Sequence, residues 1–367
     1  MERAVDSTPS DPPGDPIEVG VLIPPEWLGD RYAVALAQLE AVDPRIRVVT
    51  EPYSEPHDLR SARGTPGLAP ERLAALRAQA PVVTEAQRAA FARMHVALAI
   101  DLPFDVATMA PHLHWVQAVG AGTAQLQTAG LGAAGILLTS AAGVNAVGIA
   151  EFVVARVLGH WKHLGTLADA HRRHAWEPTY GRQLAGSTIG LIGLGEINSV
   201  VASRLNAFDV RVLATRRSAT PGATAPDVDA VFAPADLHAM LAECDAVIAA
   251  VPETPETIGV MDAAAFAAMP ERAFFCNVGR GSFVDEPALI DALTRGHLGG
   301  AALDVAGVEP LPVGDPLWDA PNLALSPHSA ASPGAMFVNL LDRFAENLRR
   351  HLTGEPLLHQ VDLDRGY

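Results

Sequence analysis

Short apolar runs alternate with longer amphipathic stretches along the first part of the chain. Strands are predicted for the apolar runs 17–23, 46–50, 95–100, 115–119 and 136–140. Helical spacing of apolar positions predicts helices at 31–41, 70–79 and 85–93. The stretch 52–70 is rich in Pro, Gly and Arg and predicts a surface loop. Strands that alternate with helices are typical of βαβ units, so this part predicts an α/β domain.

A second series of the same kind follows one long helical stretch over 145–174. Its candidate strands are 187–193, 210–215, 230–233, 246–252, 273–279, 299–305 and 323–328. These runs are almost continuously apolar, as in strands of a parallel sheet that is buried on both faces. A last helix is expected over 333–356, because Pro333 and Gly354 fit the usual start and stop signals. The pattern therefore predicts two α/β domains.

Charge and cysteine content narrow the possible partners. The 367 residues carry 26 Lys and Arg against 42 Asp and Glu, a net charge of −16, which argues against nucleic acid or an anionic membrane as the main partner. Two cysteines, Cys244 and Cys276, make no disulfide framework and favour a cytosolic (cytoplasmic) location. Residues 1–16 are acidic and Pro-rich, which predicts a flexible leader. The stretch 106–150 has no charged residue, and we interpret it as buried interior, not a membrane span.

The segment that begins the second series contains a candidate phosphate loop. Gly193 and Gly195 form G-x-G between a predicted strand and a predicted helix, the context of the dinucleotide fingerprint. The first glycine permits a tight turn, and the second lets the backbone approach a pyrophosphate at the helix N-terminus. Asn198 replaces the third glycine, which weakens the match. The alternative interpretation is a glycine turn that binds nothing.

The end of the next predicted strand indicates which dinucleotide would bind. An acidic residue there would hold the ribose 2′-hydroxyl of NAD. The sequence instead has Thr215, Arg216, Arg217 and Ser218. Guanidinium groups bind a 2′-phosphate bidentately, so NADP(H) is predicted in preference to NAD(H). The alternative is that both arginines are only solvated.

The order of motifs resembles the D-isomer-specific 2-hydroxyacid dehydrogenase family, including its glyoxylate/hydroxypyruvate reductases. The motifs that carry the resemblance are VGAGT (119–123), GVNAVGIAEFVVA (143–155), LIGLGEI (191–197), VPETPETIGVM (251–261), NVGRGSFVDE (277–286), LDVAGVEPLP (303–312) and DPLWDAPNLALSPHSA (315–330). The resemblance implies an α/β fold with two Rossmann-like domains, the nucleotide-binding one inserted into a flavodoxin-like substrate domain. It places the substrate domain at 17–142 plus 331–367 and the NAD(P)-binding domain at 143–330. It also implies a homodimer that forms largely through the nucleotide domain and the 145–174 helix.

The resemblance further implies the site residues. The catalytic set is Arg280, Glu309 and His328. The cofactor-binding set is Gly193, Gly195, Glu196, Ile197, Thr215, Arg216, Arg217, Val251, Pro252, Thr257, Val278, Gly279 and Asp304. The substrate set is Gly120, Ala121, Gly122 and Arg280. No metal-ligand set is predicted, because no carboxylate or cysteine completes a site with the histidine pairs of the 145–174 helix.

These roles agree with the chemistry of 2-oxo acid reduction. A cation such as Arg280 can fix the substrate carboxylate and polarise the ketone. His328 can donate a proton, since an unperturbed imidazole has a pKa of about 6.5. Glu309 would hydrogen-bond the other ring nitrogen and fix the tautomer. For Asp304, the resemblance implies a contact with the nicotinamide amide; the alternative is a cap on the following turn.

The expected function is the NADPH-dependent reduction of a small 2-oxo acid, such as glyoxylate or hydroxypyruvate, to the D-2-hydroxy acid. Three departures from the family pattern concern cofactor affinity and substrate identity: Thr123-Ala124 where an Asp is usual, Asn198, and Glu196 beside the expected pyrophosphate. Two alternatives stay open. One is a dinucleotide-sensing binding protein similar to the corepressors on this fold. The other is a different dehydrogenase of the family, with NAD, that oxidises formate or phosphite.

Overall fold

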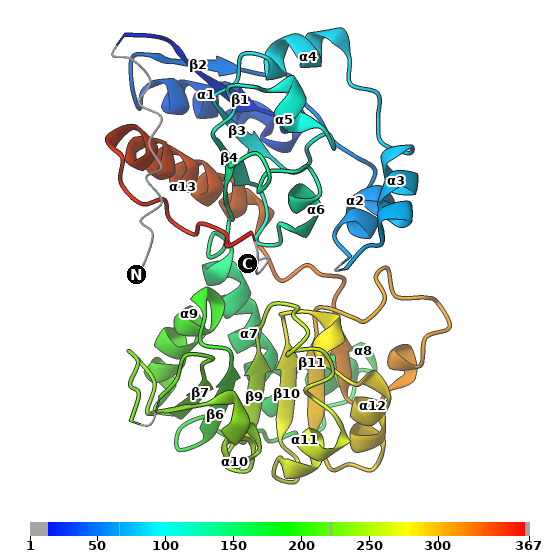
Figure 1. Cartoon of the computed structure of the whole chain (residues 1–367). Helices are drawn as coiled ribbons and strands as arrows, with labels where there is room; N and C mark the ends of the chain where they lie inside the picture. The colour runs from blue at the N-terminus through cyan, green and yellow to red at the C-terminus, as the bar shows by residue number, and fades with distance from the viewer. Residues whose placement is uncertain (1–13, 66, 221, 364–367) are drawn as a thin grey trace. The chain divides into compact units, whose positions relative to one another are not determined.

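The chain forms two compact units (Figure 1). The computed structural model describes residues 14–65, 67–220 and 222–363; the expected leader at 1–16 falls almost entirely outside them. One unit runs to Val144 and resumes at Met336, and the other comprises Asn145–Ala335. The second unit is thus inserted into the first.

The first unit contains a five-stranded parallel sheet with the strand order β2-β1-β3-β4-β5. Its strands are β1 (Ile17–Val21), β2 (Ile46–Val49), β3 (Val96–Ala99), β4 (Trp115–Ala118) and β5 (Leu137–Thr139). Each of them lies within one of the predicted apolar runs. The order is that of flavodoxin-like sheets. The expected fold class, two Rossmann-like α/β domains with a flavodoxin-like first domain, is confirmed.

Helices connect the strands of this sheet, and one more helix at the end of the chain joins the same unit. They are α1 (Tyr32–Glu40), α2 (His57–Arg63), α3 (Pro70–Arg77), α4 (Glu85–Phe91), α5 (Val106–Met109), α6 (Ala124–Gln127) and the C-terminal α13 (Pro333–Thr353). The apolar side of α13 packs on the first sheet, since Leu340, Phe344 and Leu348 share a core cluster with Val19 and Trp115.

The prediction of an irregular loop over 52–70 is wrong, because α2 lies within it. This helix buries Leu59 and Arg63. Arg63 forms an ion pair with Glu55, and both side chains are inaccessible to solvent. One of the two buried side chains of α2 is an arginine and not an apolar residue. The pattern of apolar residues therefore could not reveal this helix.

The second unit contains a seven-stranded parallel sheet of order β12-β11-β10-β9-β6-β7-β8. The strands are β6 (Thr188–Ile192), β7 (Arg211–Thr215), β8 (Ala230–Phe232), β9 (Ala246–Ala249), β10 (Phe274–Asn277), β11 (Gly300–Leu303) and β12 (Leu323–Leu325). The strand order changes direction between β6 and β9, which is the point where open α/β sheets bind ligands.

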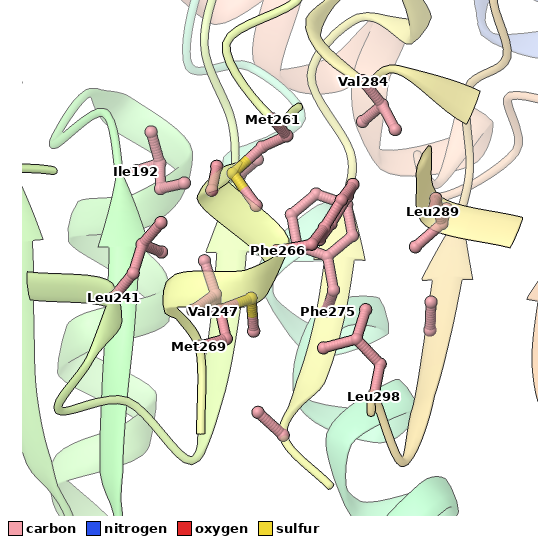
Figure 2. Packing of buried hydrophobic residues seen from close by; sticks show 14 of the residues in the cluster. Ile192, Leu241, Val247, Met261, Phe266, Met269, Phe275, Val284, Leu289 and Leu298 are labelled. Atoms are coloured by element: carbon pink, nitrogen blue, oxygen red, sulfur yellow. The ribbon is translucent and has the colours of Figure 1, made fainter. Parts of the chain in front are cut away.

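Helices cover both faces of this sheet. They are α7 (Ala146–Trp161), α8 (Leu164–Arg172), α9 (Glu196–Leu205), α10 (Leu237–Leu241), α11 (Ala263–Ala268) and α12 (Glu286–Thr294). The apolar residues of α7 and α9 form one core with one face of the sheet. Those of α10, α11 and α12 form a second core with the other face. Figure 2 shows this second core, in which Phe266 of α11 packs edge-on against Phe275 of β10.

The prediction of a single helix over 145–174 is also wrong. The helix ends after Trp161, and α8 begins at Leu164. Between them, His163 has a φ of 53°, a left-handed conformation that interrupts a right-handed helix. The helical spacing of apolar residues continues across the break, so the sequence carries no signal for it.

Among the residues that the structure describes, none of the helices combines the length and the apolar character that a bilayer crossing requires. The 106–150 stretch folds instead into parts of both units, with β4, β5 and the start of α7.

Candidate active site

The predicted site residues of the second unit lie at one edge of its sheet. Parallel strands end at the same edge, and ligands of open α/β sheets bind there. The loops that follow these strands carry almost all predicted residues, namely Gly193 and Gly195 after β6, Thr215 to Arg217 at the end of β7, Val251 after β9, Val278 to Arg280 after β10, Asp304 after β11 and His328 after β12.

The turn after β6 has the geometry of a phosphate loop. Gly193 has a φ of 83°, and a Cβ there would lie 2.5 Å from Cγ1 of Val251, so only glycine fits. Gly195 is the N-cap of α9. Apart from its neighbours along the chain, no described residue has an atom within 4 Å of the place where its Cβ would be. The turn therefore offers an open cradle beside the amides of a helix N-terminus, which fits a pyrophosphate.

The end of β7 lies beside this turn. The Thr215 hydroxyl accepts a hydrogen bond of 3.0 Å from the Gly193 amide, and its carbonyl accepts one of 2.9 Å from Leu194. Thr215 is buried, whereas Arg216 and Arg217 are exposed. The hydroxyl of Thr215 thus supports the loop, and the two exposed arginines follow directly at the end of β7.

The loop after β9 is held by its own hydrogen bonds. The Thr257 hydroxyl accepts a hydrogen bond of 2.8 Å from the Thr254 amide. The same hydroxyl donates a hydrogen bond of 2.8 Å to the Pro252 carbonyl. The Ser282 hydroxyl donates to the Glu253 carboxylate at 2.5 Å, which ties this loop to the turn that follows Arg280. The predicted residues Val251, Pro252 and Thr257 are thus held beside β10.

Arg280 lies in a turn between two glycines, and neither of these positions has room for a side chain. A Cβ at Gly279 would lie 2.8 Å from the backbone of Val251, and one at Gly281 would overlap the carbonyl of Ala306. The fully buried Asn277 accepts a hydrogen bond from the Gly279 amide at 3.0 Å and donates to the Arg280 carbonyl at 2.8 Å. The position of Arg280 relative to the loops after β9 and β11 is thereby set.

His328 and Glu309 are hydrogen-bonded to each other. Nδ1 of His328 lies 2.9 Å from one carboxylate oxygen of Glu309. The other oxygen of Glu309 accepts a hydrogen bond of 3.0 Å from the Ala306 amide. The side chain of His328 is 55% exposed and that of Glu309 38%, so a ligand can reach the imidazole. The pair that the resemblance implies is therefore formed by residues 19 positions apart.

Asp304 holds the loop that carries His328. Its buried carboxylate accepts hydrogen bonds from the Ser326 hydroxyl at 2.6 Å and from the amides of Ser329 and Ala330 at 3.0 Å each. The His328 amide donates to the Asp304 carbonyl at 2.8 Å. These bonds stabilise His328 at a φ of 50°, an unfavourable region for a residue with a side chain. These bonds hold the loop after β12, whereas the alternative placed a cap on the turn that directly follows Asp304.

The predicted substrate loop belongs to the first unit. Gly120, Ala121 and Gly122 follow β4 and are exposed, whereas Thr123 is buried. The carbonyl of Gly120 accepts a hydrogen bond of 2.9 Å from the Ala141 amide, which fixes the start of the loop.

Two residues outside the predicted set support the loops that carry Arg280 and Glu309. Asn277 organises the Arg280 turn as described above. Glu286, in the first turn of α12, accepts a hydrogen bond of 2.7 Å from the Gly307 amide, two residues before Glu309. Both residues lie in the NVGRGSFVDE motif, whose non-catalytic polar positions are the signal that could have indicated them.

Together, the fold and the site define a dinucleotide-binding α/β protein with an Arg and a His–carboxylate pair at the ligand edge. Residues 154–330 match the sequence profile of the D-isomer specific 2-hydroxyacid dehydrogenase, NAD binding domain. A D-3-phosphoglycerate dehydrogenase of Mycobacterium leprae (strain TN) is 31% identical over 264 residues, which are 71% of this chain and 49% of that protein. The chain spans about half the length of the curated relatives it matches.

Solved structures extend the similarity to nearly the whole chain. A D-isomer specific 2-hydroxyacid dehydrogenase from Xanthobacter autotrophicus Py2, in complex with NADPH and MES, is 29% identical with a TM-score of 0.72, covering 96% of this chain and 100% of that one. An NADPH-dependent glyoxylate/hydroxypyruvate reductase from Sinorhizobium meliloti, in complex with NADP and sulfate, is 25% identical with a TM-score of 0.70. The match covers 96% of this chain and 100% of that one. The chain belongs to the D-isomer specific 2-hydroxyacid dehydrogenase family, as its motifs predict.

Proposed function

We propose that the protein is an NADPH-dependent reductase of small 2-oxo acids, such as glyoxylate or hydroxypyruvate, and that it produces the D-2-hydroxy acid. The observation that carries the proposal is the 2.9 Å hydrogen bond between His328 and Glu309, at the sheet edge where Arg280 and the glycine loop also lie. The relatives in complex with NADPH or NADP, one of them a glyoxylate/hydroxypyruvate reductase, support the cofactor and substrate class.

The residues divide the chemistry between them. The Arg280 guanidinium holds the substrate carboxylate and polarises the ketone. Since Nδ1 of His328 is engaged by Glu309, Nε2 is the nitrogen that passes a proton to the ketone oxygen. The negative charge of Glu309 stabilises the imidazolium before that transfer. When bound, NADPH supplies the hydride that the ketone carbon gains.

A panel of 2-oxo acids tests the proposal. Purified protein with NADPH and glyoxylate, hydroxypyruvate, pyruvate or oxaloacetate should oxidise NADPH, followed as loss of absorbance at 340 nm. Turnover with at least one of the small acids is expected. Cofactor binding without turnover of any acid would favour a dinucleotide-sensing binding protein. Turnover confined to formate or phosphite with NAD would identify a different dehydrogenase.

The cofactor preference rests on Arg216 and Arg217. Changing both to Ala should lower kcat/KM for NADPH by roughly 10- to 100-fold, because a 2′-phosphate loses charge-assisted hydrogen bonds, and should leave kcat/KM for NADH nearly unchanged. Arg211→Ala is the control, since that arginine lies at the opposite end of β7 and pairs with Glu243. Equal losses for both cofactors, or an NADH preference in the unaltered protein, would contradict the assignment.

The expected homodimer would form through α7, α8 and the segment that follows. Apolar side chains there are largely exposed, namely Leu164, Leu167, Trp176 and Tyr180. Exposed apolar patches of this kind mark protein interfaces. Light scattering coupled to size exclusion should give the mass of two chains, and Leu167→Asp should shift the protein toward monomer. Val34→Asp, on the exposed side of α1, is the control and should leave the mass unchanged.

The cytosolic location is still a prediction, and it rests on the sequence having two cysteines and no disulfide framework. Cys244 and Cys276 are both free and buried. Burial raises the pKa of each thiol to about 12, so both are unreactive at neutral pH.

A further inference from the structure

The residue that replaces the third fingerprint glycine makes specific contacts. Asn198 lies in the first turn of α9 and is completely buried. Its Nδ2 donates to the carbonyl of Ile192 at 3.0 Å and to that of Gly193 at 2.9 Å. The Asn198 side chain thereby joins α9 to the last residue of β6 and to the first residue of the phosphate loop.

These two bonds fix the orientation of the Asn198 amide. The reverse orientation would place its Oδ1 against two carbonyl oxygens, which have no proton to donate. In the observed orientation Oδ1 is buried and has no hydrogen-bond partner among the residues that the structure describes. A buried acceptor without a partner opposes folding. The two bonds made by Nδ2 are thus the polar contacts that favour an asparagine at this position.

Together with Thr215, Asn198 holds the phosphate loop from two sides. The Gly193 amide donates to the Thr215 hydroxyl at 3.0 Å, and the Gly193 carbonyl accepts from Asn198. The next amide, that of Leu194, is bonded to the Thr215 carbonyl at 2.9 Å. The loop is therefore constrained before a ligand arrives, and a constrained loop loses less conformational entropy on binding.

We propose that Asn198 is a positioning residue for the cofactor phosphates: its amide fixes the Gly193–Gly195 turn so that the cradle at Gly195 is preformed. A glycine at this position supplies no donor to the two carbonyls. The departure from the fingerprint therefore strengthens cofactor binding. The inference rests on NAD(P) binding by the second unit and is independent of which acid is reduced.

The test is to restore the glycine of the fingerprint. Asn198→Gly should raise the Kd of NADPH, measured by titration of cofactor fluorescence, by roughly tenfold, the loss expected for two buried hydrogen bonds of modest net strength. KM for NADPH should rise in parallel, while kcat at saturating cofactor stays within about twofold. Without cofactor, hydrogen exchange of the peptide covering 191–199 should become faster. Ser199→Ala, an exposed neighbour on α9, is the control and should change none of these quantities.

Two further variants test the proposal if the Asn198→Gly protein folds poorly. Asn198→Ser retains a hydroxyl donor for one carbonyl and should give an intermediate Kd. Asn198→Asp places a carboxylate beside two carbonyl oxygens and should bind NADPH more weakly than either. A Kd that is unchanged in folded variants, even with a lower Tm, would mean a purely structural role and would overturn the proposal. The Kd is measured without an oxo acid, so absent turnover would contradict only the proposed function.

Discussion

Replacing His328 by alanine should lower kcat by about 10²- to 10⁴-fold, the usual contribution of a positioned general acid. The imidazole is hydrogen-bonded to Glu309 at 2.9 Å and lies on a loop that Asp304 holds in place. Removal of the ring takes away the proton donor without altering the glycine loop after β6. The Kd of NADPH should therefore stay within about twofold of the original value.

Two variants make this test specific. Glu309→Gln keeps an oxygen that can accept the hydrogen bond but removes the charge that favours the imidazolium, so its loss of kcat should be smaller than that of His328→Ala. His238→Ala, on the exposed side of α10, should have no effect. A kcat that survives the loss of His328 would contradict its role as proton donor.

Replacing Arg280 by alanine should lower kcat/KM for the oxo acid by at least about 10²- to 10³-fold, the range for removal of one stabilising donor at a developing charge. Unlike His328→Ala, this change should also raise KM for the acid, because the substrate carboxylate loses its cation. Arg280→Lys should restore activity only in part, since an ammonium group lacks the planar fork of a guanidinium.

The rigid surroundings of Arg280 make this effect attributable to the guanidinium. Gly279, Gly281 and Asn277 fix the backbone of the turn through their own contacts, and the Arg280 guanidinium adds one hydrogen bond of 2.8 Å to the Gly279 carbonyl. Arg295→Ala, at the exposed end of α12, is the matched control. An Arg280→Ala protein that keeps its KM for the acid would show that another group binds the carboxylate.

The fold could be predicted because its strands are buried on both faces. Runs such as 187–193 and 246–252 are almost continuously apolar, and the structure places β6 and β9 within them. The two errors have a different origin. The helix α2 packs inward through the buried pair of Arg63 and Glu55, and the break at His163 is a change of backbone conformation inside a continuous apolar pattern. Neither is encoded in hydrophobic periodicity.

The contact between His328 and Glu309 could be predicted, because both residues lie in motifs that carry the resemblance. The contact of Asp304 could not be predicted, because it depends on strand pairing: Asp304 holds the His328 loop only because β11 pairs with β12. The bonds of Asn277 are local, to residues two and three positions further along the chain, and they depend on the turn that the backbone makes at Arg280. Asn198 weakens the match to the fingerprint, and the sequence gives no sign that its amide bonds to the loop.

The central claim is that the His328–Glu309 pair and Arg280 serve the reduction of a 2-oxo acid by NADPH. The most direct measurement is the reaction with hydroxypyruvate as the sole acceptor, in which NADPH consumption is compared with product formation and the product is resolved on a chiral column. We predict one D-glycerate formed per NADPH consumed, and product formation by the His328→Ala protein that is slower by at least about 10²-fold. Formation of the L-isomer, or equal product from the His328→Ala protein, would contradict the account.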